Sequence, residues 1–161
     1  METLTIEDIW QALDDIKDPE IPVVSLVELG IVRDVGVTGG KVTVTITPTF
    51  SGCPALNVMK AAIAERLLGM GVASVEVRQV VSPAWSSDWI SAEGRRKLKE
   101  FGLAPPLRHG GDFEILLLDA AACPHCDSQN TTLKNSFGPT LCRALYYCHA
   151  CRQPFEAFKP L

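Results

Sequence analysis

Four cysteines, arranged as two C-x-x-C pairs, carry the most specific chemical signal in the chain. The first pair is Cys123 and Cys126, the second is Cys148 and Cys151, and 21 residues lie between them. Two such pairs can place four thiolates at the corners of a tetrahedron, which is the geometry of a structural zinc site. The spacing therefore predicts one structural zinc per chain. A rubredoxin-type iron or an iron–sulfur cluster would use the same four thiolates, and disulfides are the further alternative.

Cys53 is the second position that could do chemistry. Before it, over residues 41–47, apolar residues alternate with threonines, and after it, over residues 56–67, apolar residues recur at helical spacing. A thiol at the start of a helix faces unpaired N–H groups and the positive end of the helix dipole. We therefore expect Cys53 to ionise more readily than a free thiol. The thiolate could bind a soft metal or attack an electrophile, and the alternative is a buried structural cysteine.

Asp18 and Glu20 are the carboxylates that could work with Cys53. They flank Pro19, directly after a stretch whose apolar spacing predicts a helix over residues 6–16. Paired carboxylates could act as acid and base. Acidic residues beside a proline more often form turns, so a structural role is the alternative.

The other cysteine and the three histidines are less informative. Cys142 could be an ordinary strand residue, a fifth thiol near the metal or a second reactive group. His125 and His149 lie inside the cysteine pairs, which already supply four ligands, so we treat them as non-ligands. The sequence suggests no partner for His109, and it shows no Ser/His/Asp set, P-loop or dinucleotide-binding glycine pattern.

The elements around Cys53 predict a compact first domain. Alternating apolar residues predict strands over residues 31–37, 41–47 and 73–81, and the helix after Cys53 should end near Gly69. The pair Gly39 and Gly40 closes a hairpin between the first two strands. This order predicts an α+β fold, a small mixed sheet with helices on one face, followed by a C-terminal zinc ribbon.

Three segments are expected along the chain. Residues 1–106 should form the α+β domain, including a helical extension that carries Trp85 and Trp89. Residues 107–118 should form a linker and an entry strand, and residues 119–161 the zinc ribbon. A tail of this length cannot fold on its hydrophobic core alone, so the ribbon needs its metal.

Composition limits the classes of partner. The 161 residues carry a net charge of −4, with a pI near 5.3, and 47% of them are hydrophobic. An acidic chain is not expected to bind nucleic acid, and no apolar run reaches the length of a membrane span. The acidic N-terminus does not read as a signal peptide. We expect a cytoplasmic protein whose cysteines stay reduced or bind metal.

Three motifs of the first domain resemble one protein family. The stretches 18–22 (DPEIP), 28–32 (ELGIV) and 49–54 (TFSGCP) are similar to the iron–sulfur assembly factors named for their D-P-E motif. Glu28 stands where that family usually has aspartate. The resemblance implies that Cys53 handles iron or an iron–sulfur cluster, held transiently, for delivery to client proteins.

A second resemblance covers nearly the whole chain. The stretches 82–91, 93–106 and 136–146 are similar to the D subunits of the bacterial phenylacetyl-CoA 1,2-epoxidase system. That system belongs to phenylacetate catabolism, a route of aromatic compound degradation, and uses a di-iron oxygenase and an iron–sulfur flavin reductase. The resemblance implies an accessory subunit that matures one or both of these partners and is not itself the oxygenase. It also places Cys142 inside a family motif.

Three hypotheses follow. In the first, the protein is an assembly factor that assists insertion of iron or iron–sulfur clusters through Cys53, with Asp18 and Glu20 nearby. In the second, it is an architectural subunit that stabilises the complex without metal transfer. In the third, it is a thiol redox enzyme in which Cys142 resolves Cys53. Only the third makes the chain an enzyme, and a homodimer is compatible with all three.

Overall fold

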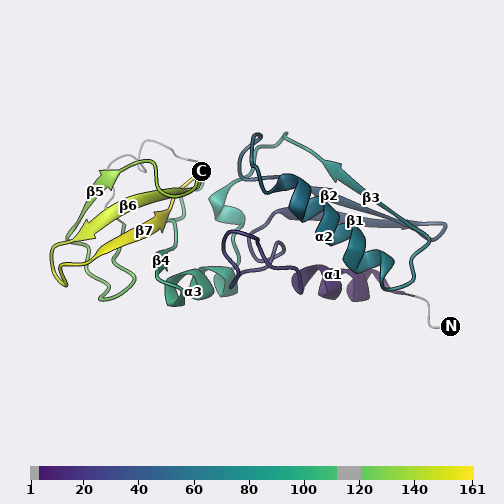
Figure 1. Cartoon of the computed structure of the whole chain (residues 1–161), viewed down its shortest axis with the longest axis horizontal. Helices are drawn as coiled ribbons and strands as arrows, with labels where there is room; N and C mark the ends of the chain where they lie inside the picture. The colour runs from purple at the N-terminus through teal and green to yellow at the C-terminus, as the bar shows by residue number, and fades with distance from the viewer. Residues whose placement is uncertain (1–3, 112–120) are drawn as a thin grey trace. The chain divides into compact units, whose positions relative to one another are not determined.

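The computed structural model describes residues 4–111 and 121–161 and divides the chain into two compact units, with the boundary between Trp85 and Ser86. Each unit has its own sheet (Figure 1). The entry strand that the sequence predicts after the linker falls on residues 113–118, which lie outside the described residues. None of the helices described is both long enough and apolar enough to span a membrane.

The first unit is a three-stranded mixed sheet with two helices. In chain order its elements are α1 (Ile6–Asp14), β1 (Val32–Thr38), β2 (Lys41–Ile46), α2 (Leu56–Leu68) and β3 (Ser74–Gln79). The strand order is β1-β2-β3, with β1 antiparallel and β3 parallel to β2 (Figure 1). Helix α1 contacts β1, α2 contacts β3, and the two helices contact each other. The α+β fold with a small mixed sheet is therefore confirmed.

Local sequence explains where these elements begin and turn. Thr5 and Asp8 form a capping box at the start of α1: the Thr5 hydroxyl accepts the Asp8 N–H at 3.1 Å, and the Asp8 carboxylate accepts the Thr5 N–H at 2.8 Å. Gly39 and Gly40 have positive φ angles of 56° and 80°, which a hairpin turn of two residues requires. In β2 every second residue is buried, as the alternation with threonine predicts.

The segment between α1 and β1 is packed without forming a strand. Val24 and Leu26 are fully buried, and backbone bonds of Val24 and Leu26 tie the segment to Asp18 and Ile16. Glu28, the departure from the D-P-E family pattern, accepts the N–H of Ser25 at 2.9 Å through its carboxylate. A longer acidic side chain is therefore accommodated as a buried turn acceptor, which explains why glutamate is tolerated there.

The second unit contains a four-stranded sheet. Its elements are the short 3-10 helix η1 (Ser87–Trp89), α3 (Ala92–Glu100), β4 (Leu103–Ala104), β5 (Thr131–Asn135), β6 (Arg143–Cys148) and β7 (Pro154–Phe158). The strand order is β4-β7-β6-β5; β4 is parallel to β7 and the other pairs are antiparallel. Ser91 caps α3 by accepting the Gly94 N–H at 3.0 Å.

Residues 86–106 belong to the second compact unit, whereas the sequence had suggested that they extend the first domain. The reason is strand β4, which pairs with β7 near the end of the chain. A strand of two residues has no periodicity of its own, so the sequence carried no sign of this pairing. Trp85 stays in the first unit, where its indole N–H donates to the carbonyl of Leu29 at 2.9 Å, and Trp89 belongs to η1 of the second.

Candidate functional site

The four paired cysteines converge on one point of the second unit. Their sulfur atoms all lie within 4.8 Å of one another. The Sγ atoms of Cys123 and Cys151 are 3.7 Å apart, and those of Cys126 and Cys148 are 3.6 Å apart. A disulfide needs about 2.05 Å, and none of the six cysteines, all of which the structure describes, forms one. A tetrahedral ion with metal–sulfur bonds of about 2.3 Å would separate its sulfurs by roughly 3.8 Å, so the four residues fit such an ion.

Tight backbone turns present the sulfurs. Asp127 and Arg152, each directly after the second cysteine of a pair, have positive φ angles of 61° and 60°. Aspartate tolerates this conformation better than most residues. The turns are closed by backbone bonds, such as that from the Asp127 N–H to the carbonyl of Cys123 at 2.9 Å. The second pair extends from β6, whose last residue is Cys148.

Backbone N–H groups stabilise a thiolate in the four-cysteine cluster, which favours the binding of a cation. The N–H groups of Cys151 and Ala150 act on the sulfur of Cys148 and lower its pKa to about 6. Burial, together with the neighbouring sulfurs, raises the pKa of Cys151 to about 12. Four adjacent thiolates repel one another, so complete ionisation needs a cation among them. The donor set is that of zinc or of an iron–sulfur centre.

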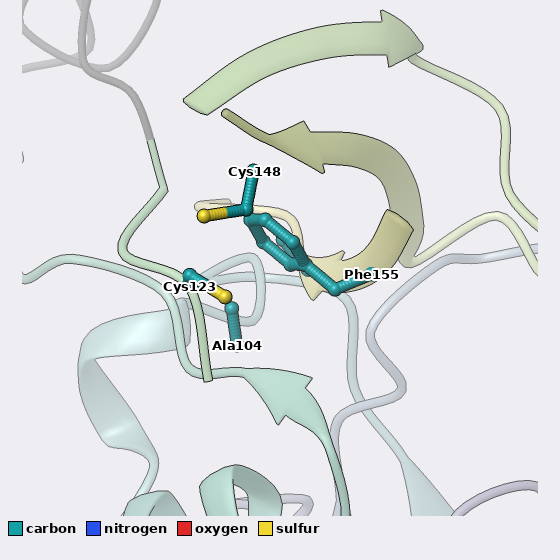
Figure 2. Close-up of a cluster of buried hydrophobic side chains, with 5 residues drawn as sticks. Ala104, Cys123, Cys148 and Phe155 are labelled. Atoms are coloured by element: carbon teal, nitrogen blue, oxygen red, sulfur yellow. The ribbon is translucent and has the colours of Figure 1, made fainter. Parts of the chain in front are cut away.

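A small apolar core encloses the cluster from one side. Cys123 and Cys148 are fully buried and pack with Ala104, Phe155 and Ala157 (Figure 2). The ring of Phe155 stacks on Tyr146 with 5.6 Å between the ring centroids. This cluster is too small to fold the ribbon by itself, which agrees with a site whose metal contributes folding free energy.

Cys53 lies in a turn just before α2. The N-cap of the helix is Ala55, and the carbonyl of Cys53 accepts the N–H of Leu56 at 3.2 Å. The side chain is partly exposed rather than sealed in the core. The N–H groups of Ala55 and Leu56 act on its sulfur and favour the thiolate, as expected for a thiol before a helix.

The expectation that Cys53 ionises readily is nevertheless wrong. Burial raises the pKa of the thiol, the carboxylates of Glu20 and Asp18 raise it further, and the N–H groups of α2 do not compensate. The sequence showed the helix but not that the turn after α1 would bring two negative charges to the sulfur. At neutral pH the residue is therefore a thiol with anionic neighbours.

Asp18 and Glu20 share this neighbourhood but differ in their bonds. One carboxylate oxygen of Asp18, Oδ1, accepts the N–H of Glu20 at 2.8 Å and that of Ile21 at 2.9 Å. Asp18 thus forms the turn around Pro19, which was the structural alternative. Both carboxylates still act electrostatically on Cys53, so the fold brings together the three residues that the sequence had grouped.

Cys142 and the histidines lie outside these two groups. Cys142 is buried directly before β6, with the Thr140 hydroxyl 3.1 Å from its sulfur, and the four-sulfur cluster does not include it. His149 Nε2 lies 2.7 Å from the hydroxyl of Thr132. These contacts favour structural roles for Cys142 and His149.

Ser86, Asp88 and His109 form a cluster that the sequence spacing did not predict. Ser86 Oγ lies 3.4 Å from His109 Nε2, and His109 Nδ1 lies 3.9 Å from a carboxylate oxygen of Asp88. However, Nδ1 accepts the N–H of Gly111 at 2.9 Å, and Nε2 lies 2.8 Å from a backbone oxygen of Leu161. The proton is therefore on Nε2, the wrong tautomer for a Ser-His-Asp triad, because Asp88 receives no proton from the ring.

Asp88 is occupied by the backbone instead. Its two carboxylate oxygens accept the N–H groups of His109 at 3.0 Å and Gly110 at 2.8 Å. Burial acts to raise the pKa of Asp88, but these donors outweigh it and the net pKa is lowered. The cluster therefore holds residues 109–111 against η1. The sequence had not predicted these contacts of His109.

Comparison with known proteins agrees with this two-part structure. Residues 6–78 match the model of the family described as "Iron-sulfur cluster assembly protein", and residues 115–159 match that of the "PaaD zinc beta ribbon domain". A crystal structure of a domain of unknown function from Bacillus anthracis is 28% identical. It covers 57% of this chain and 89% of its own, with a TM-score of 0.54.

Two relatives extend the comparison. A Porphyromonas gingivalis (strain ATCC BAA-308 / W83) protein named Fe-S protein maturation auxiliary factor is 35% identical over 58% of this chain and 90% of its own length. An Escherichia coli (strain K12) protein, provisionally named as the D component of 1,2-phenylacetyl-CoA epoxidase, is 42% identical over 96% of this chain and 92% of its own length. The chain therefore belongs to the PaaD family, the D subunits of the phenylacetyl-CoA epoxidase system, with an N-terminal domain of the iron–sulfur cluster assembly family.

Proposed function

We propose that this protein is an accessory factor of the phenylacetyl-CoA epoxidase system that assists insertion of iron or an iron–sulfur cluster into a partner subunit. Cys53 is the transient ligand of the cargo, and Glu20 and Asp18 supply negative charge beside it. The observation that carries the proposal is the pairing of a partly exposed thiol with two carboxylates at the start of α2. The names of the relatives, an epoxidase component and iron–sulfur maturation factors, support the same role.

The charges around Cys53 favour a cation as cargo over thiol chemistry. A nucleophilic or redox cysteine is usually activated by positive neighbours, which stabilise the bare thiolate. Here burial and two carboxylates oppose the bare thiolate. A bound cation removes that opposition, since it attracts the sulfur and both carboxylates at once. The same groups that make Cys53 a poor free nucleophile therefore suit it to hold a metal ion.

The four-cysteine site has a separate role in this proposal. Cys123, Cys126, Cys148 and Cys151 hold one structural zinc, since four thiolates leave no open position for a substrate. The ribbon recruits the di-iron oxygenase or the iron–sulfur flavin reductase to the Cys53 domain. A permanent metal in one unit and a transient one in the other would keep fold stability independent of cargo transfer.

The test is to produce the epoxidase subunits together with Cys53→Ser in cells that lack the native protein. We expect the variant to fold with its zinc bound, while iron per purified oxygenase and reductase falls at least severalfold. Iron content and the visible absorption of the reductase cluster measure this. Ser51→Ala, an exposed substitution in the same loop, is the matched control and should behave as wild type.

The alternatives give different outcomes. An architectural subunit predicts full iron content with Cys53→Ser and loss of the isolated complex with Cys123→Ser. A thiol redox enzyme predicts equal loss of epoxidase activity with Cys53→Ser and Cys142→Ser, and a mixed disulfide that can be trapped. Fully metallated partners in the Cys53→Ser strain would end the carrier proposal.

A further inference from the structure

We propose that the metal of the four-cysteine centre holds in place not only the ribbon but also the helix–strand segment before it, residues 91–104. Loss of the metal then releases α3 and β4 together with β5, β6 and β7. The inference rests on metal binding at the four cysteines, as proposed above. The family model for the ribbon begins at residue 115 and does not include this segment.

Strand β4 connects the segment to the metal ligands. Ala104 is 1% exposed and belongs to the same buried cluster as Cys123 and Cys148 (Figure 2). Its neighbour Leu103 is 2% exposed, and the two residues pair in parallel with Glu156 and Ala157 of β7. Any movement of the two cysteines on metal loss therefore changes the surface against which Ala104 packs.

The end of α3 meets the first cysteine pair at two further points. Lys99 forms an ion pair with Asp127, with 2.5 Å between Nζ and Oδ1. A Cβ atom placed on Gly102 would lie 3.6 Å from the ring of His125, which is ordinary van der Waals distance. His125 and Asp127 flank Cys126 in the sequence. The ion pair is exposed and contributes little free energy, but it and the approach of the His125 ring to Gly102 both depend on the position of the loop that carries Cys126.

The segment has little stability of its own. Helix α3 has nine residues, fewer than an isolated helix needs in water, and Gly94 and Leu98 are its buried residues. Strand β4 has two residues and depends on β7 for its pairing. A ribbon of about 40 residues depends in turn on its metal. The order of the segment therefore depends on the metal through the ribbon.

This dependence is reciprocal. If metal binding favours the docked segment, then docking of the segment raises metal affinity by the same factor. The segment of residues 91–104 thus acts as a positioning element for the centre, although none of its residues is a ligand. Damage to β4 should weaken metal retention without touching a cysteine.

Trypsin tests the first half of the inference, because α3 carries four cleavage sites: Arg95, Arg96, Lys97 and Lys99. The full-length protein, with metal content measured by elemental analysis, is digested briefly before and after treatment with a strong zinc chelator. We expect cleavage in α3 to rise at least about tenfold with metal loss, in parallel with cleavage at Lys134 in β5. Added zinc should restore protection at both places. If α3 stays protected in protein shown to be metal-free, the inference is wrong.

Substitution of Ala104 tests the second half. Ala104→Asp places a charge in the buried cluster, whereas Ala92→Asp makes the same change at an exposed position in the first turn of α3. We expect Ala104→Asp to release zinc to a chromogenic chelator at least about tenfold faster than wild type, and Ala92→Asp to match wild type. Equal rates for the two variants would overturn the inference. A wild-type protein purified without any metal would instead contradict the proposed metal site, so the two failures are distinguishable.

Discussion

At the scale of single residues, opposing neighbours set the charge on the sulfur of Cys53. The N–H groups of Ala55 and Leu56 favour the thiolate, while burial and the carboxylates of Glu20 and Asp18 favour the thiol. The thiol prevails at neutral pH, so the residue should react with alkylating and oxidising reagents more slowly than a thiol with an ordinary pKa. The four sulfurs of the ribbon differ, because the backbone already favours one thiolate, at Cys148.

The pH dependence of Cys53 reactivity follows from this balance. Because the pKa of Cys53 is raised, a smaller fraction of it should be thiolate at about pH 8.5, the pKa of a free thiol, than in a peptide. Glu20→Gln removes one raising charge, so the apparent pKa should fall and alkylation by iodoacetamide at this pH should accelerate. Rates against pH, followed by mass spectrometry, measure this.

The control for this experiment is Glu65→Gln, which removes an exposed charge near the far end of α2. It should leave the profile unchanged. An apparent pKa for wild-type Cys53 below that of a free thiol would show that the helix N–H groups prevail after all, and would remove the electrostatic argument for a cation.

At the scale of elements, the turn between α1 and β1 places the carboxylates. Asp18 receives two backbone N–H groups, and its own N–H donates to the carbonyl of Val24 at 2.9 Å. The turn therefore rests on this side chain as an acceptor. The negative charge of Asp18 has a separate effect, because it raises the pKa of Cys53.

Two substitutions at Asp18 separate these properties. Asp18→Ala leaves two N–H groups without their acceptor and should lower the free energy of unfolding by about 1–3 kcal/mol. Asp18→Asn keeps an oxygen in the same place and should lose much less, although it removes the charge. Urea unfolding measures both. Equal losses for the two variants would show that the charge, and not the acceptor, holds the turn.

At the scale of the whole molecule, the chain has two hydrophobic cores, which should differ in whether their stability depends on metal. The core of residues 1–85 is built from helices α1 and α2 on a sheet, with residues such as Ile9, Leu13, Val44 and Ile63 fully buried. The core of residues 86–161 contains two of the four paired cysteines, Cys123 and Cys148. Only the second core should respond to metal.

Calorimetry should separate the two cores. A chelator should remove or strongly lower the unfolding transition of residues 86–161 and leave that of residues 1–85 nearly in place. Tryptophan fluorescence offers a second probe, since Trp10 and Trp85 report on the first unit and Trp89 on the second. One transition that shifts as a whole would mean that the metal stabilises both units together.

The sequence by itself determined the features that depend on local patterns. Alternation over residues 41–47 and helical spacing over residues 56–67 predicted β2 and α2, because burial on one face follows the period of each element. The spacing of the four cysteines predicted their convergence, because two C-x-x-C pairs are the ligand pattern of a single tetrahedral metal site. The motifs that resemble two protein families correctly predicted the families to which the comparisons assign the chain.

Only the tertiary structure decided the features that depend on distant neighbours. The raised pKa of Cys53 arises because the turn after α1 brings Glu20 and Asp18 to a sulfur more than thirty residues later in the chain. The pairing of β4 with β7 joins residues 103–104 to residues 156–157. Electrostatic fields and strand pairing act through space, so neither leaves a periodic trace in the sequence.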